Sequence, residues 1–164
     1  MKSIEIDKEL EELRLNRHCS WAKLVSKLKK QLDLHIEDLL VEKGYKNFKL
    51  GYMPFLMNID SEGITNSDLA KRFSVTKQAS SKILNELIEL NYITAAPHGA
   101  DGRSSIVFLT DKGKRFVVEA KRCMDLLAQE YSVLLGKKNF ENLRDMMAKV
   151  IEYNAKKRGV VSYM

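Results

Sequence analysis

The sequence is poor in the residues that mark metal sites, disulfides and membrane spans. It holds two cysteines and three histidines in 164 residues. Cys19 and Cys123 lie far apart and suggest no disulfide framework, and the histidines lack the spacing of metal ligands. No apolar run approaches the length of a membrane span. We therefore expect no metal, no cofactor and no membrane partner, and a reduced, cytoplasmic setting fits the few cysteines best.

Patterns that define other protein classes are missing as well. Residues 1–14 are charged and lack an apolar core, so they do not read as a signal peptide. We find no nucleophile–base pair, phosphate-binding loop or paired carboxylates, and so expect no enzyme. The net charge of +6 allows nucleic acid as a partner. Between Gly51 and Arg115, however, bases and acids nearly cancel, so any such argument depends on where the side chains lie.

Residues 65–90 predict two short helices joined by a tight turn. Thr65 is placed to cap the first helix, with Asp68 in the capping-box position, and Thr76 is placed to cap the second. Residues expected to face inward are Leu69 and Ala70 on the first helix, Phe73 and Val75 at the corner, and Ala79, Ile83, Leu87 and Leu90 on the second helix. The pattern is that of a helix-turn-helix, although an ordinary helical hairpin with a solvated face remains the alternative at this point.

The opposite face of the second helix is polar. Gln78 can pair with adenine through two hydrogen bonds, and Ser81, one turn later, can donate to or accept from a base edge. Lysines and the free amides of a helix N-terminus suit phosphates. The candidate DNA contacts on this helix are Thr76, Lys77, Gln78, Ser81 and Lys82.

A β-hairpin is predicted directly after the second helix. Asn91 suits a left-handed helix end. Residues 92–94 and 105–109 are rich in β-formers, and the segment between them contains turn-forming residues, with Arg103 near the tip. A helix-turn-helix with an attached hairpin is a winged helix, so we expect a mainly α fold with a small β-hairpin wing.

The order of these segments resembles the MarR family of bacterial transcription regulators. The most telling motif is Asp101-Gly102-Arg103-Ser104, followed by an apolar strand and by Leu109-Thr110-Asp111-Lys112-Gly113. The resemblance implies a homodimer that binds an inverted repeat of double-stranded DNA through paired recognition helices and wings. In many members a small ligand or an oxidant releases the DNA.

The wing arginine is the sharpest candidate for a DNA contact. Arg103 can enter a narrow minor groove, where the potential is most negative. Asp101 can orient the guanidinium of Arg103 through a charge-assisted hydrogen bond, and the resemblance implies the same roles. Ala95, Ala96 and Gly102 stand where relatives often carry arginine, which predicts fewer phosphate contacts and a shallower salt dependence.

Long helices are expected on both sides of the winged helix. Ser3 to Glu42 carries an apolar stripe, a helix capped by Thr110 should run to about Leu135, and Asn139 should cap a final helix. Such stripes need another helix or a second subunit to cover them. We therefore divide the chain into a dimerisation helix and connection (1–49), a winged helix-turn-helix (50–115), and C-terminal dimerisation helices with a tail (116–164). The apolar stripes are expected at Trp21, Leu24, Val25, Leu28, Leu32 and Leu39, at Phe116, Val117, Ala120, Met124, Leu127, Tyr131 and Leu134, and at Leu143, Met146, Met147, Val150, Ile151 and Asn154.

The sequence favours a homodimeric repressor relieved by a small-molecule effector. One alternative is a thiol switch at Cys19, since family members that sense peroxides use an N-terminal cysteine, although the local motif here differs. Another is a winged helix used to bind proteins without specific DNA binding. By resemblance, the candidate ligand pocket would be lined by Trp21, Tyr45, Phe48, Tyr52 and Phe55.

Overall fold

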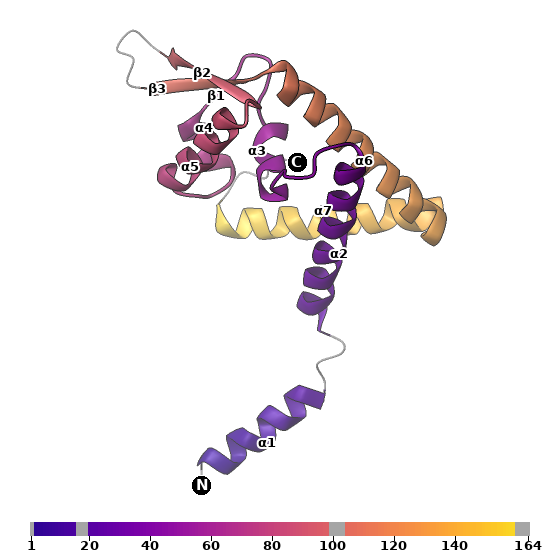
Figure 1. Cartoon of the computed structure of the whole chain (residues 1–164). Helices are drawn as coiled ribbons and strands as arrows, with labels where there is room; N and C mark the ends of the chain where they lie inside the picture. The colour runs from indigo at the N-terminus through magenta and orange to yellow at the C-terminus, as the bar shows by residue number, and fades with distance from the viewer. Residues whose placement is uncertain (1, 16–19, 99–103, 160–164) are drawn as a thin grey trace.

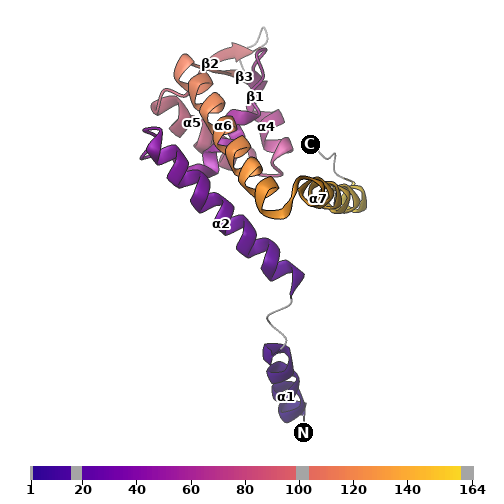
Figure 2. The ribbon, with the colours of Figure 1, turned by 90° about the vertical axis from the view of Figure 1, so that its right-hand side faces the viewer.

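Helices dominate the computed structural model, which describes residues 2–15, 20–98 and 104–159 (Figures 1 and 2). The helices are α1 (Lys2–Leu15), α2 (Trp21–Glu42), a 3-10 turn (Leu50–Tyr52), α3 (Met53–Met57), α4 (Asn66–Arg72), α5 (Lys77–Glu89), α6 (Asp111–Leu135) and α7 (Lys137–Arg158). The strands are β1 (Ile64–Thr65), β2 (Ile93–His98) and β3 (Ser104–Leu109). The predicted mainly α fold with a β-hairpin wing is confirmed. In the part of the chain that is described, no helix is long and apolar enough to cross a membrane.

The small sheet is antiparallel in the order β1-β3-β2. Its first strand was not predicted, because two residues carry no alternating pattern. β2 extends to His98, although the sequence suggested that the strand ended at Thr94. Pro97 lies opposite Ser105, and because β2 is an edge strand the missing N–H of the proline is tolerated.

The core lies where α3, α5, α6 and the sheet meet, and one end of α2 covers it. Phe116 of α6 is fully buried, with its ring centroid 4.0 Å from that of Phe48 and 5.0 Å from that of Tyr45. Tyr92 closes the cluster, its ring centroid 5.4 Å from that of Phe116. The connection between α2 and α3 is thus fastened to α6 by aromatic packing.

Three of the predicted helix caps are confirmed. The hydroxyl oxygens of Thr65, Thr76 and Thr110 accept hydrogen bonds from the amides three residues later, at distances of 3.1–3.2 Å. The predicted cap at Asn139 is wrong, since α7 already begins at Lys137. The side chain of Asn139 instead donates to the carbonyl of Leu135, 2.9 Å away, and so satisfies the end of α6.

The predicted inward stripe of α5 was partly wrong. Leu87 is buried as expected, but the buried face continues through Leu84 and Ser80, whereas Ala79 and Leu90 are exposed. The small side chain of Ser80 fits the interior despite its hydroxyl, and a pattern based on polarity alone misses it. At the corner Phe73 packs inward as predicted, with its ring centroid 4.6 Å from that of Phe55, whereas Val75, also predicted to face inward, is 38% exposed. The inward positions of Leu69 and Ala70 are confirmed.

The two ends of the chain keep much apolar surface uncovered. The sequence left open whether residues 3–17 continue the helix that ends at Glu42 or form a separate arm. The structure describes two helices there: Ser20, just before α2, has extended backbone angles, and α1 stands apart in both views (Figures 1 and 2). None of the described residues of α7 is buried. Exposed large apolar side chains on α2, the end of α6 and α7 include Trp21, Leu24, Val25, Leu28, Val133, Leu134, Met146, Met147, Val150, Ile151 and Tyr153.

Candidate nucleic-acid interface

The polar face of α5 is accessible over most of its length. Lys77, Gln78 and Lys82 are exposed, and Ser81 is half-buried. All four line one shallow hollow, together with Asn85, Glu86 and Glu89. The structure thus gathers the candidate base-reading and phosphate-binding side chains on one surface. The N-terminus of α5 is capped by Thr76.

Ser81 is held in place by a residue of α4. The side-chain amide of Asn66 donates to the hydroxyl oxygen of Ser81 at 2.6 Å and lies 3.4 Å from the carbonyl oxygen of Lys77. Because the hydroxyl of Ser81 accepts this bond, its own hydrogen is free to donate to a base edge. Sequence analysis missed Asn66; its only signal was a polar residue directly after the cap at Thr65.

The C-terminal half of α5 has a second anchor. Lys49 donates to the carboxylate of Glu86 at 2.5 Å and to the hydroxyl of Tyr52 at 2.9 Å, and that hydroxyl also donates to Glu86. The hydrogen bonds from Lys49 and Tyr52 lower the pKa of Glu86, and the bond to Glu86 raises the pKa of Lys49. These contacts tie the helix to the connection before α3. Sequence analysis also missed them, because Lys49 and Glu86 are 37 residues apart.

The motif after the wing fastens the end of α5 to the start of α6. Asn91 has a φ of 59° as predicted, and the hydroxyl of Thr110 donates to its carbonyl at 2.7 Å. The ammonium group of Lys112 lies 2.7 Å from the carbonyl oxygen of Leu90. A Cβ added at Gly113 would lie 2.1 Å from the carbonyl oxygen of Tyr92, so only glycine fits there. The motif therefore holds the end of α5 in place against the start of α6.

Three of the candidate functional residues lie outside the described part of the chain: Arg103 and Asp101 at the wing, and Cys19. The roles of these three residues stay predictions. The described part of the wing is the pairing of β2 with β3, from Ile93 opposite Leu109 to His98 opposite Ser104. Within residues 2–15, 20–98 and 104–159, no cluster of three or more histidine, cysteine or acidic side chains is placed to hold a metal.

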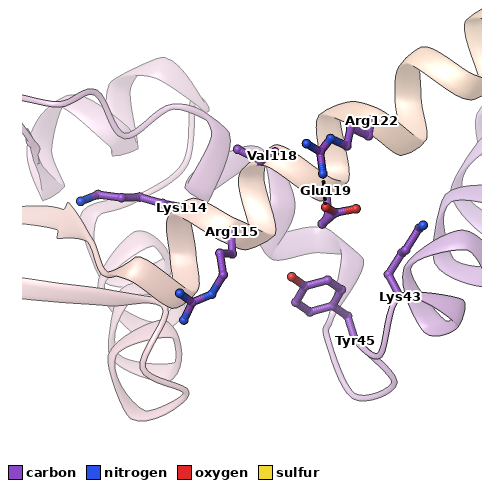
Figure 3. Close-up of a pocket in the computed structure, with 7 residues that line it drawn as sticks. All are labelled: Lys43, Tyr45, Lys114, Arg115, Val118, Glu119 and Arg122. Carbon is purple, nitrogen blue, oxygen red and sulfur yellow. Dashed lines mark hydrogen bonds and ion pairs between the residues drawn. The ribbon is translucent and has the colours of Figure 1, made fainter.

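The aromatic candidates for a ligand pocket are not gathered in one cavity. Phe48, Tyr52 and Phe55 are buried in the core, and Trp21 is 62% exposed at the start of α2. Tyr45 lines a hollow that has a volume of about 570 Å³ and lies between the end of α2 and α6 (Figure 3). Whether any of these side chains binds a ligand stays a prediction. Cys123 is buried, and burial is the main cause that raises the pKa of its thiol.

Comparison with known proteins identifies sequences that resemble this chain. A model of the MarR family matches residues 47–104. The HTH-type transcriptional regulator TcaR of Staphylococcus aureus is 29% identical over 100 residues, which is 60% of this chain and 66% of the relative. The chain thus aligns with slightly under two thirds of that relative's length.

Two solved structures share the fold. The S. aureus MepR–DNA complex has a TM-score of 0.67 at 19% identity, covering 82% of this chain and 98% of that one. CouR from Rhodococcus jostii, bound to p-coumaroyl-CoA, has a TM-score of 0.63 at 16% identity, covering 80% and 91%. At these identities the likeness concerns the fold alone.

Proposed function

Because this chain belongs to the MarR family of winged-helix proteins, we propose that it is a homodimeric transcription regulator that binds an inverted repeat of double-stranded DNA. The observation that carries the proposal is the polar face of α5, which is exposed and anchored to the rest of the winged helix at both ends. A recognition helix must be rigid as well as accessible, since base contacts depend on its placement in the groove.

Each candidate contact has a distinct task in this proposal. Gln78 and Ser81 read base edges, and Arg103 enters the minor groove with Asp101 orienting it. Lys77, Lys82 and the amides that follow Thr76 hold phosphates. The MepR structure, which is a complex with DNA, supports this partner for the fold.

The homodimer is supported by the uncovered apolar side chains of α2, the end of α6 and α7. A second copy of the chain would cover them and set the distance between two recognition helices at about 34 Å, one turn of DNA. We propose that the protein is a cytoplasmic repressor, and that a small molecule favours a dimer geometry in which this spacing is lost. The ligand-bound CouR structure supports an effector in this fold.

The test is a selection of genomic DNA fragments by the purified protein at physiological salt. We expect wild type to recover a common inverted repeat. Arg103→Ala should weaken binding to that repeat about tenfold, the loss expected for a groove-reading arginine. Lys121→Ala, which removes an exposed positive charge from α6, is the matched control and should bind as wild type does.

Recovery of random fragments, or equal affinity in wild type and Arg103→Ala, would contradict the proposal. The chain would then be better described as a winged helix that binds proteins, an alternative that the near-neutral charge of residues 51–115 leaves open.

A further inference from the structure

The hydrogen bond between Asn66 of α4 and Ser81 of α5 has a defined direction. The two helices pack against each other (Figure 1), and Asn66, the first residue of α4, reaches α5 with its side chain. Its amino group lies 2.6 Å from the hydroxyl oxygen of Ser81 and 3.4 Å from the carbonyl oxygen of Lys77. A carbonyl oxygen only accepts hydrogen bonds, so the amino group, and not the amide oxygen, belongs on this side. Asn66 is therefore the donor and Ser81 the acceptor.

This direction leaves the hydroxyl hydrogen of Ser81 for another partner. A serine hydroxyl has one hydrogen and two lone pairs, and on its own it turns to suit either a donor or an acceptor. Here the amino group of Asn66 occupies one lone pair, and its hydrogens repel the hydroxyl hydrogen. Among the residues that the structure describes, Ser81 donates to none. Because Ser81 also lines the hollow on the polar face of α5, its hydrogen is available to a base that enters the hollow.

Asn66 acts through Ser81 and does not itself face a ligand of α5. Its amide oxygen is enclosed by the protein and has no hydrogen-bond partner within the described chain, and its amino group is directed at α5. Asn66 is also absent from the residues that line the hollow. It is thus a positioning residue, whereas Gln78 and Ser81 present their polar groups on the accessible face.

We propose that Asn66 determines which base Ser81 selects in the major groove, because it holds the hydroxyl of Ser81 as a donor. In that groove guanine presents two acceptors, N7 and O6, and thymine presents O4, whereas cytosine presents only the N4 amino group, which is a donor. Ser81 should therefore favour guanine over cytosine at the base that it contacts. This inference rests on the proposed function, and adds to it a residue that sets specificity without touching DNA.

The test measures affinities for the selected repeat and for its single-base variants by fluorescence anisotropy. Ser81→Ala first identifies the base pair that Ser81 reads, which is the pair at which this variant no longer discriminates. At that pair, wild type should bind guanine about fivefold more tightly than cytosine, the ratio expected for one good hydrogen bond.

Asn66→Asp gives the sharpest result, because it reverses the direction of the hydrogen bond. A carboxylate only accepts, so the hydroxyl of Ser81 would donate to it and present its lone pairs to the groove. The ratio of affinities for guanine and cytosine should then fall below one. In Asn66→Ala the hydroxyl turns freely, and the ratio should lie between those of wild type and Asn66→Asp. Damage to the fold would weaken binding to both bases alike and would not produce this order.

Ser67→Asp is the matched control for the added negative charge. Ser67 follows Asn66 on α4, and consecutive side chains of a helix do not face the same way, so its carboxylate would not meet Ser81. This variant should weaken binding to every repeat by a similar factor and keep the guanine-to-cytosine ratio of wild type.

Two results would overturn the inference. The first is the same ratio in wild type and Asn66→Asp. The second is a loss of affinity in Ser81→Ala that is equal for all sequences, since Ser81 would then contact a phosphate, which carries no sequence information.

The hydrogen bond is also tested without DNA, by urea denaturation of Asn66→Ala, Ser81→Ala and the double variant. The double variant should lose less stability than the sum of the two single variants, because each single variant already breaks the bond. Additive losses would mean that the bond is not formed, and would overturn the inference. If no common repeat is recovered, the proposed function fails and the base preference with it, while this cycle still decides whether Asn66 holds Ser81.

Discussion

The middle of the chain and its two ends use apolar residues in opposite ways. Between Ile36 and Leu127, large apolar side chains are largely buried, and Leu56, Leu69, Leu87 and Phe116 are fully so. In α7 none of the described residues is buried, and in the first half of α2 Leu24, Val25 and Leu28 are more than 40% exposed. The middle finds its packing partners on its own chain, whereas the ends do not.

This difference indicates what each region needs in order to be stable. Burial of apolar surface is the main favourable term in folding, and the middle obtains it within one chain. Long helices whose apolar stripes are uncovered gain this free energy of burial only when they pack against another surface. The contrast thus separates a winged helix that packs within its own chain from helices that suit a second copy.

The largest effect on the free energy of unfolding should come from a substitution in the middle of the chain. Phe116→Ala removes a fully buried ring that packs against Tyr45, Phe48 and Tyr92. We expect the free energy of unfolding to fall by about 3–5 kcal/mol, since the lost contacts leave a cavity. Urea denaturation at a fixed protein concentration measures it.

Val118→Ala, two residues along the same helix and 49% exposed, is the control and should change the free energy by less than about 1 kcal/mol. If Phe116→Ala and Val118→Ala lowered the free energy of unfolding by similar amounts, burial within the single chain would not explain the stability of the middle region.

A smaller and different effect is expected at the ends. Ile151→Glu places a charge among exposed apolar residues of α7. If a second copy covers them, the charge would be buried without a partner, and the dissociation constant of the dimer should rise at least tenfold. Sedimentation equilibrium measures this, and circular dichroism should show an unchanged helix content.

Lys156→Glu on the same helix is the control, because Lys156 pairs with Glu152 at 2.8 Å on a different face of α7 from Ile151, and its substitution should leave the dimer intact. A monomeric wild type, or equal dissociation in both variants, would mean that a second copy is not what the uncovered ends require.

The sequence was most informative where a local interaction decides the structure. Thr65, Thr76 and Thr110 were recognised as caps because each bond spans three residues, and Asn91 because few residues tolerate a positive φ. The wing followed from β-rich runs on both sides of turn-forming residues. These features lie within short windows of the chain.

The features that sequence analysis missed depend on contacts between distant residues. Asn66 supports Ser81 from another helix, and Lys49 reaches Glu86 across 37 positions. Ser80 was absent from the predicted inward stripe because polarity, not size, guided the choice. The hollow beside Tyr45 combines Lys43 with Arg115 and Arg122. Helical spacing places the two arginines on one face of α6, but nothing in the sequence indicates that Lys43 lies beside that face.

The smallest effect we predict is a pH dependence of folding stability that arises from buried groups in the middle of the chain. Burial raises the pKa of Cys123 above its ordinary value of 9.0, and also raises the pKa values of Tyr45 and Tyr92, all in the middle of the chain. Above about pH 9 the unfolded chain loses the thiol proton while the folded chain keeps it, so folding stability must fall as pH rises.

Urea denaturation of wild type and Cys123→Ala measures this fall in stability. The measurements run from about pH 7.5 to about pH 10, which spans the range where the thiol titrates. Wild type should lose stability from about pH 9, whereas Cys123→Ala should hold its stability until the tyrosines begin to titrate near pH 10. Equal slopes in the two proteins would mean that the thiol ionises as readily in the folded chain as in the unfolded one. The side of α6 that carries Cys123 would then be open to water, and the boundary between the buried middle and the uncovered ends would have to be drawn before residue 123.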